Sequence, residues 1–298
     1  MEKKKWDGQT QANSLGIKIF IITISFFGLL PAYFLLFFVS WYYTLFVTAH
    51  NKFIKSFRSK LGLSTNLINI YKHNFIFGLN IVDRFAHLVM KKSPFKFECI
   101  GEEHLVNALS KNTGLIVLSS HIGNQEIAGD MLFSHIKTGI NFLKLDNEKQ
   151  SVKKVINTIA EERPVKIIPT NSSSIDMMIQ VRSALVNNEI VCMLGDRVMG
   201  EEPFMKINFL GKEAKFPTSP FNIAAITGTP VICAVTIKTG IKKYRQEVFD
   251  YISFENTTRS NRENKIKESM VKYVNILEQI VRQNPYHWFN FYDYWEEY

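Results

Sequence analysis

A histidine and a glutamate five residues apart are the side chains of this sequence best placed for chemistry. They occur in His121-Ile-Gly-Asn-Gln-Glu126, directly after the apolar residues 114–120. A histidine whose ring is held by a carboxylate serves as a general base near neutral pH. Two residues five apart within one helix diverge by about 140°, so the pair can meet only where His121 precedes a helix that has Glu126 in its first turn. The pattern therefore predicts a strand, a turn that carries His121, and a helix.

The turn around His121 has three features that favour a functional site over a structural hydrogen bond, which is the alternative for this pair. A strand-to-helix junction exposes the histidine at an edge of the sheet, where α/β proteins bind their ligands. Gly123 permits an unusual backbone angle next to it. The N-terminus of the helix points N–H groups at a bound ligand, and its positive end favours the neutral imidazole that a base requires.

A second apolar segment also ends in charged side chains. Glu189-Ile-Val-Cys-Met-Leu-Gly is followed by Asp196 and Arg197. These two residues form either a surface ion pair or a site that positions a substrate, with Arg197 available to a phosphate or carboxylate. Arg182, on the predicted helix before this strand, is a further substrate-binding candidate, and its alternative is a solvated surface residue.

Strand and helix patterns alternate through the last two thirds of the chain. Apolar runs predict strands, and 3.6-residue periodicity predicts helices. The expected strands cover residues 95–100, 114–120, 139–145, 165–168, 189–195, 231–238 and 246–254, and the expected helices cover 102–110, 124–134, 149–163, 175–187, 219–227 and 261–283. A long loop is expected after residue 195. Such alternation predicts one α/β domain, residues 93–298, with a mostly parallel central sheet flanked by helices.

The N-terminal residues predict a membrane anchor. No charged residue occurs between positions 19 and 49, and about 20 apolar residues cross a bilayer as a helix. Pro31 lies near the middle and basic residues flank both ends, so a single span and a re-entrant hairpin both remain open. A hydrophobic pair of core helices is the alternative. Residues 50–92 have the periodicity of amphipathic helices, and residues 1–92 are therefore expected to form a membrane-embedded helical segment.

The composition limits the partners. The chain carries 36 lysines and arginines against 27 acidic residues, a net charge of +9, which suggests an anionic partner. The apolar N-terminus favours a membrane surface over nucleic acid, and the C-terminal aromatic residues lack the interleaved basic residues of a base-stacking surface. The three cysteines share no CxxC spacing, and Cys192 and Cys233 are expected to be buried thiols in a reducing compartment. The sequence contains no HExxH motif, and we expect neither a metal nor a cofactor.

The histidine box resembles the histidine-x4-acid box of the lysophospholipid acyltransferase superfamily, and most of all that of the late acyltransferases of lipid A biosynthesis. The segment that ends in Asp196-Arg197 resembles the second strand of that family. Phe209-Leu-Gly-Lys-Glu-Ala-Lys-Phe-Pro-Thr-Ser-Pro and Ala-Ala-Ile-Thr-Gly-Thr-Pro-Val at 224–231 resemble its next block. The hydrophobic N-terminus fits as well, so the resemblance covers nearly the whole chain.

This resemblance implies a glycerolipid acyltransferase-like fold and a direct acyl transfer. His121 would take the proton of an acceptor hydroxyl as it attacks an acyl thioester, and Glu126 would hold the imidazole. The N–H groups near Gly123 and Asn124 are candidate oxyanion donors. The implied donor is acyl carrier protein, the implied acceptor is a lipid A precursor-like lipid, and the implied location is the cytoplasmic face of the bacterial inner membrane.

Several departures point to another acceptor. Gln125 stands where the lipid A enzymes usually carry tryptophan, Lys144 stands near an expected arginine, and the C-terminus lacks a basic Arg-Arg-Phe pattern. The alternatives are an O-acyltransferase for phospholipids or aminolipids that uses acyl-CoA, and a membrane-binding protein without activity. A serine hydrolase through Ser119 or Ser120 is a further alternative, although no GxSxG elbow surrounds them.

Overall fold

The structure is a computed structural model that describes residues 14–90, 93–125, 127, 138–144, 165–170 and 174–295. The described residues form two compact units. The first ends at Phe95, and the second comprises Lys96–Lys144 and the residues from 165 onward. The helices predicted over 124–134, apart from Gln125 and Ile127, and over 149–163 lie outside the described residues.

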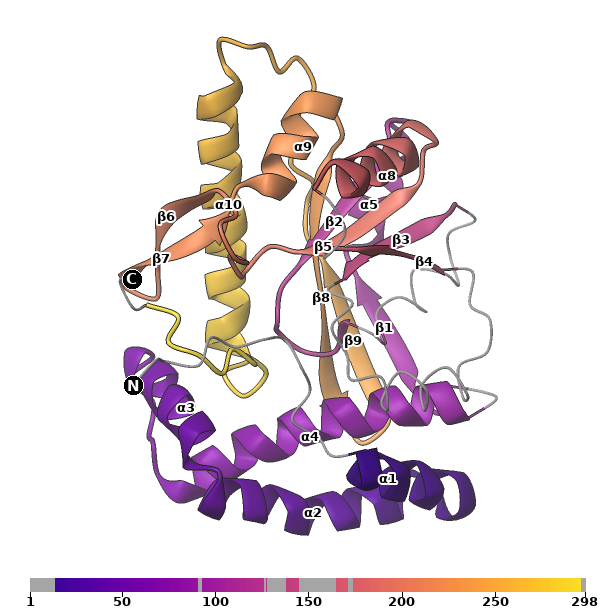
Figure 1. Ribbon diagram of the computed structural model, residues 1–298, viewed down its shortest axis with the longest axis vertical. Coiled ribbons are helices and arrows are strands. Elements are labelled where there is room, and N and C mark those ends of the chain that lie inside the picture. The colour runs from indigo at the N-terminus through magenta and orange to yellow at the C-terminus, as the bar shows by residue number, and fades with distance from the viewer. Residues whose placement is uncertain are drawn as a thin grey trace. The chain divides into compact units, whose positions relative to one another are not determined.

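Seven strands form the central sheet of the second unit, in the order β1-β9-β8-β2-β5-β3-β4 (Figure 1). Their bounds are β1 Lys96–Ile100, β2 Leu115–Ser119, β3 Ile140–Lys144, β4 Val165–Pro169, β5 Ile190–Leu194, β8 Val231–Gly240 and β9 Lys243–Val248. The five strands from β8 to β4 are parallel to one another. Strand β9 pairs antiparallel with β8 and parallel with β1. The predicted α/β class with a mostly parallel sheet is therefore confirmed.

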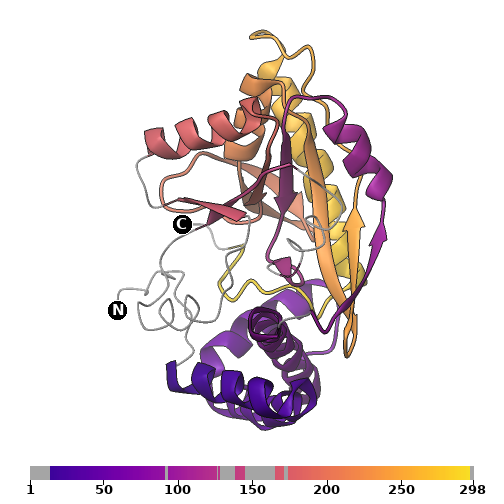
Figure 2. The ribbon, with the colours of Figure 1, turned by 90° about the vertical axis from the view of Figure 1, so that its right-hand side faces the viewer.

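Helices cover both faces of this sheet. Helix α5 (Glu102–Leu109) packs on β8 and β9, α8 (Ser174–Val186) packs on β4 and β5, and α9 (Ser219–Thr227) contacts β2 and α10 (Arg262–Gln283). Figure 2 shows α5 in front of the sheet and α10 behind it. Because helices cover both faces, the central strands are apolar on both sides, as in β2, where Leu115 to Leu118 are all buried.

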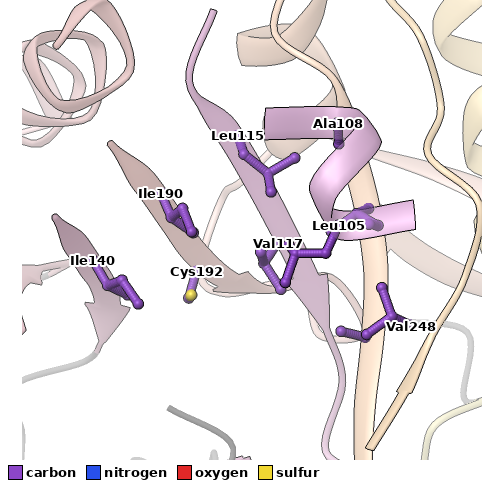
Figure 3. Close-up of a cluster of buried hydrophobic side chains, with 10 residues drawn as sticks. Leu105, Ala108, Leu115, Val117, Ile140, Ile190, Cys192 and Val248 are labelled. Carbon is purple, nitrogen blue, oxygen red and sulfur yellow. The ribbon is translucent and has the colours of Figure 1, made fainter. Parts of the chain in front are cut away.

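One face of the core is built between α5 and the strands. Leu105 and Ala108 of α5 pack over Leu115 and Val117 of β2, and the cluster extends across β5, β3 and β9 (Figure 3). Cys192 belongs to this cluster, and burial raises the pKa of its thiol to about 12. The expectation that Cys192 and Cys233 are buried thiols is confirmed.

Two details of the second unit differ from the sequence prediction. The expected loop after residue 195 contains a two-stranded hairpin, β6 (Phe204–Phe209) and β7 (Lys212–Pro217). Its two-residue turn, Leu210-Gly211, has φ of +55° and +82°, as in a primed hairpin turn, but a leucine there gives no turn signal. Strand β9 covers Lys243–Val248 rather than the predicted 246–254, and its buried face consists of Tyr244, Gln246 and Val248.

The described part of the first unit contains four helices: α1 Ser14–Phe27, α2 Leu29–Phe46, α3 Thr48–Lys60 and α4 Leu67–Val89. The apolar run is broken at Gly28, with φ of +83°, and not at Pro31. Pro31 lies in the first turn of α2, where a missing N–H leaves no hydrogen bond unmade. Among the described helices, α2 is long and apolar enough to cross a membrane, by length and composition.

Helix α2 packs antiparallel along α4. The hydroxyl of Tyr33, near the start of α2, donates to the carboxylate of Asp83, near the end of α4. At the other ends of the two helices, the amide of Asn74 donates to the hydroxyl of Thr44 at 3.1 Å, and the rings of Trp41 and Tyr71 stack with centroids 4.4 Å apart. Small and polar side chains of α2 thus face α4.

Candidate active site

The pairing of β2 with β5 brings two distant segments of the chain together. Ser119, the last residue of β2, pairs in register with Leu194, the last residue of β5. The N–H of Gly195 then donates to the carbonyl of Ser119 at 2.9 Å. The segments that follow β2 and β5 leave the sheet at the same edge. His121 lies two residues beyond β2 and Asp196 lies two residues beyond β5, so the two residues are neighbours.

The Asp196 carboxylate holds His121 by two hydrogen bonds. The ring Nδ1 of His121 lies 2.8 Å from Oδ1, and the backbone N–H of His121 donates to Oδ2 at 2.9 Å. The Asp196 side chain is fully buried, whereas 25% of the His121 side chain is exposed. An ionised carboxylate can only accept, so Nδ1 carries the proton and Nε2 keeps a lone pair. We call these residues the His121–Asp196 pair.

The surroundings set the charge of each partner. Burial holds the pKa of His121 below its ordinary value, and the Arg197 cation acts in the same direction, while Asp196 opposes both. Burial on its own would raise the pKa of Asp196, but His121, Arg197 and the amide of Asn290 together hold it below the ordinary value. Near neutral pH the pair therefore consists of a neutral imidazole and a carboxylate, the state that a general base needs.

Residues 284–295, the C-terminal segment, lie along the other side of His121. The N–H of Phe289 donates to the carbonyl of His121 at 2.8 Å, and the N–H of Gly123 donates to the carbonyl of His287 at 2.9 Å. The side chains of the segment also hold Asp196: Asn290 donates to its Oδ2 at 2.9 Å, and the Tyr294 hydroxyl donates to its backbone carbonyl at 2.6 Å.

The aromatic side chains of the C-terminal segment are part of the core. Trp288, Tyr294 and Trp295 are buried around Phe209 of β6. The indole N–H of Trp295 donates to the carbonyl of Phe209 at 3.1 Å. These aromatic side chains therefore pack in the core, and this packing fixes the C-terminal segment against the hairpin.

Comparison with known proteins identifies the family. The family model described as bacterial lipid A biosynthesis acyltransferase matches residues 74–297. The chain belongs to this family. It is therefore an acyltransferase. No curated protein matches the chain. Among solved structures, the crystal structure of the 1-acyl-sn-glycerophosphate (LPA) acyltransferase PlsC from Thermotoga maritima is similar over 82% of this chain and 94% of that chain, with 14% sequence identity and a TM-score of 0.35.

In this acyltransferase, Asp196 has a different place from the one expected. It is neither in a surface ion pair nor at an exposed substrate site, because it is fully buried beneath His121. The carboxylate that contacts the Nδ1 of His121 in the described residues is that of Asp196. Glu126 lies outside the described residues, and a role for it in catalysis stays a prediction.

Arg197 is held within the protein. Its Nε donates to the side-chain oxygen of Asn290, and its Nη2 donates to the carbonyl of Phe289 at 2.9 Å. Its guanidinium also lies over the ring of Tyr292, 5.5 Å from the centroid. These contacts fix the C-terminal segment to the end of β5, so the expected contact of Arg197 with a substrate phosphate has no support in this geometry.

The N–H groups expected to stabilise an oxyanion are also engaged. Gly123 donates to His287 O, and Asn124 donates to Thr236 O at 2.8 Å. An oxyanion role for these two groups therefore has no support. The need for glycine is steric: φ is +69° at Gly123, and a Cβ there would lie 2.0 Å from the Thr236 carbonyl oxygen.

The remaining candidates lie on other elements. Lys144 ends β3, two strands away from β2, at the same edge of the sheet. Arg182 is exposed on α8. Both remain substrate-binding predictions, without a described contact to the His121–Asp196 pair.

The geometry disfavours a serine nucleophile. The hydroxyl oxygens of Ser119 and Ser120 are both buried, and Ser120 is 1% exposed. The Nδ1 of His121 is occupied by Asp196, and within the described residues neither hydroxyl is hydrogen-bonded to the ring. A nucleophile needs contact with both its base and its substrate, which these positions do not provide.

Three residues that surround Asp196 are not marked as site residues by any sequence motif. They are Asn290 and Tyr294 of the C-terminal segment and Tyr273 of α10, whose hydroxyl donates to the carbonyl of Ser119 at 2.9 Å. Burial and the charge of Asp196 raise the pKa of both tyrosines well above the ordinary value, so both remain hydrogen-bond donors. The only sequence signal was the polar Asn290 within an aromatic segment.

Proposed function

We propose that this protein transfers a fatty acyl chain from an acyl thioester to a hydroxyl group of a lipid, with His121 as general base. The observation that carries the proposal is the hydrogen bond of 2.8 Å between Nδ1 of His121 and the buried Asp196. This bond fixes the tautomer in which Nε2 can accept a proton. The family membership supplies the reaction class.

The proposed reaction is direct. Nε2 of His121 takes the proton of the acceptor hydroxyl while that oxygen forms a bond with the carbonyl carbon of the thioester. The tetrahedral intermediate then breaks its carbon–sulfur bond, and the leaving thiolate takes the proton back from Nε2. The products are an ester and a free thiol. Asp196 stays ionised throughout and stabilises the transient imidazolium, as the acid of a catalytic triad does.

The proposed substrates follow from the family and the charge. Acyl carrier protein is the proposed donor, because a chain with a net charge of +9 attracts an acidic carrier. The proposed acceptor is an amphipathic lipid that resembles a lipid A precursor. Gln125 and Lys144 depart from the lipid A pattern, so an O-acyltransferase for another lipid, with acyl-CoA or acyl carrier protein as donor, is the second candidate.

The proposed location is a membrane surface, at the cytoplasmic face of the bacterial inner membrane. Helices α1 and α2 expose large apolar side chains, namely Leu15, Ile19, Ile22, Phe26, Phe27, Leu30, Phe34, Phe37, Phe38, Tyr42, Leu45 and Phe46. A continuous exposed apolar surface of this kind marks a membrane or protein contact, and lipid substrates favour the membrane.

An arrangement within one leaflet fits the packing of the first unit better than a crossing. Helix α2 lies along α4 from Tyr33 to Thr44. If α2 crossed the bilayer, α4 would follow it and carry Lys72, Asp83 and Arg84 into the hydrocarbon. Each such charge costs several kcal/mol at the bilayer centre, about 3 kcal/mol on insertion scales. We therefore propose that α1 and α2 lie in the interface with their exposed faces in the acyl chains.

Mass spectrometry of cellular lipids tests the proposed function. Bacterial cells with the intact gene are compared with cells that carry no copy and with cells that carry His121→Ala at equal protein level. The proposal expects one lipid class to gain an ester-linked acyl chain only with the intact gene. Identical lipid profiles in all three strains would overturn it. The mass of the lipid that changes names the acceptor and the chain length.

A further inference from the structure

The side chain of Asn290 connects the two charged residues that follow β5. Its Nδ2 donates to Oδ2 of Asp196 at 2.9 Å, and its Oδ1 accepts from Nε of Arg197. The residue is 5% exposed. One primary amide thus satisfies a carboxylate and a guanidinium at once, 94 residues away from the aspartate in sequence.

This position requires a group that is both donor and acceptor. A carboxylate has acceptors only, and a guanidinium has donors only. An aspartate at position 290 would accept from Arg197 but would place a second negative charge beside Asp196. An alanine would remove both bonds and leave buried charged groups with fewer partners, which is costly in a low-dielectric interior.

We propose that Asn290 is a positioning residue that acts on His121 through Asp196. The inference rests on the proposed function, in which His121 is the base. Asn290 and the backbone N–H of His121 both donate to Oδ2 of Asp196 and so orient Oδ1 toward the ring Nδ1. The C-terminal segment is then a part of the active site that contacts no reacting atom.

The expected effect of Asn290 is on the proton affinity of His121. The amide draws charge from Asp196, and without it the carboxylate attracts an imidazolium more strongly. Within the described residues, the other titratable groups around Asp196 are Arg197, Tyr273 of α10, and Tyr292 and Tyr294 of the C-terminal segment. Tyr273 and Tyr294 stay protonated, so the loss of the Asn290 amide is expected to raise the pKa of His121.

The experiment measures this proton affinity without any acyl transfer. Diethyl pyrocarbonate modifies neutral imidazole, and mass spectrometry of peptides gives the rate at each histidine as a function of pH. The full-length protein is compared with Asn290→Ala, with Asn290→Asp, and with the control Asn208→Ala, which removes an exposed amide of β6. His104 of α5, partly exposed beside Asp250, serves as an internal reference in every sample.

The proposal expects the midpoint of His121 modification to rise by about one pH unit in Asn290→Ala, and further in Asn290→Asp. His104 is expected to keep its midpoint in all variants, and Asn208→Ala is expected to match the parent protein at both histidines. An unchanged His121 midpoint in folded Asn290 variants would overturn the proposal. Loss of the fold in both variants would also overturn it, because the near-isosteric aspartate should preserve packing.

The proposed function and the role of Asn290 fail separately in this design. A shifted midpoint in a protein that transfers no acyl chain would leave the role of Asn290 intact and reject the reaction. An active protein in which the midpoint of His121 modification is unchanged by the Asn290 substitutions would reject the role of Asn290 and leave the proposed reaction intact.

Discussion

The carboxylate of Asp196 accepts both the ring Nδ1–H and the backbone N–H of His121, at 2.8 and 2.9 Å. One side chain therefore fixes the position of the histidine and the tautomer of its ring. The two residues lie 75 positions apart, and the parallel pairing of β2 with β5 is what makes them neighbours. The proposed base and the acid that orients it thus follow two central strands of the sheet.

Asp196→Asn is expected to abolish most of the activity without loss of the fold. An asparagine at this position can donate to Nδ1, which would move the ring proton to Nε2 and remove the base. We expect the rate constant of acyl transfer to fall by about three to four powers of ten, as for the corresponding change in a catalytic triad. Initial rates of acyl transfer with purified protein, supported by circular dichroism, measure this loss.

Glu126→Gln is the matched comparison for that prediction. It changes the acid of the histidine box by the same single group but leaves Asp196 at Nδ1. A rate loss at least tenfold smaller than that of Asp196→Asn is expected. If Glu126→Gln were the more damaging change, the orienting role would belong to Glu126.

The pH dependence of the activity follows from the lowered pKa of His121. A base must be neutral to act, and a lowered pKa means that the ring stays neutral on the acidic side of its ordinary value of 6.5. The acid limb of kcat/KM against pH is therefore expected below pH 6.5. An acid limb above pH 6.5 would show that the charge of Asp196 raises the pKa of His121 by more than burial and the Arg197 cation lower it.

The same shifts predict acid sensitivity of the fold. Both His121 and Asp196 have a lower pKa in the folded state than in the unfolded chain. Each contributes stability that is present above the unfolded-state pKa and is lost as the pH falls through the folded-state pKa. The melting temperature is expected to fall as the pH drops below 6.5 and again below about 4. In His121→Phe, the first of these decreases is expected to be smaller than in the parent protein.

Gly123→Ala is expected to destabilise the protein much more than Gly211→Ala. Both glycines have positive φ, of +69° and +82°, but a Cβ at Gly123 would meet the Thr236 carbonyl, whereas the space around Gly211 is open. We expect a loss of about 3 kcal/mol at Gly123 and about 1 kcal/mol at Gly211. Thermal unfolding of the two variants makes the comparison, and equal losses would mean that no close approach exists at Gly123.

The exposed face of α2 is expected to hold the protein on membranes. Phe34 and Phe38 are 69% and 55% exposed, and withdrawal of one phenylalanine from lipid costs about 2 kcal/mol. Replacing both by glutamate is expected to release much of the protein in flotation assays with anionic lipid vesicles. Glutamates at Ile175 and Ile179 of α8, 72% and 60% exposed, are the control and should leave binding unchanged. Equal release by both pairs would show that α2 has no special part in attachment.

The fold could be predicted because its signals are local. The buried run of β2 and the periodicity of α10 each lie within one short window of sequence. The β6–β7 hairpin was missed because its turn, Leu210-Gly211, lacks the asparagine or aspartate typical of such turns. The sequence left open whether the apolar run is one span or a hairpin; it breaks at Gly28, whereas Pro31 lies in the first turn of α2, where a proline is compatible with a helix.

The site could be predicted only in part because its contacts are not local. His121 and Asp196 were both recognised as residues at the edge of the sheet. Their pairing depends on which strands are neighbours, and sequence distance favoured Glu126 as the partner. Arg197 was expected to bind substrate, but the C-terminal segment occupies it. Nothing in the aromatic sequence around Asn290 indicated that it returns to the end of β5.

The most direct test of the central claim is the transfer of a labelled acyl chain by the purified protein. Acyl carrier protein that carries an isotopically labelled fatty acyl chain is incubated with a bacterial lipid extract and with the parent protein or His121→Ala. The account predicts labelled lipid ester and an equal amount of free carrier thiol with the parent protein, and neither above background with His121→Ala. Labelled ester formed at similar rates by both proteins would contradict the assignment of His121 as the base.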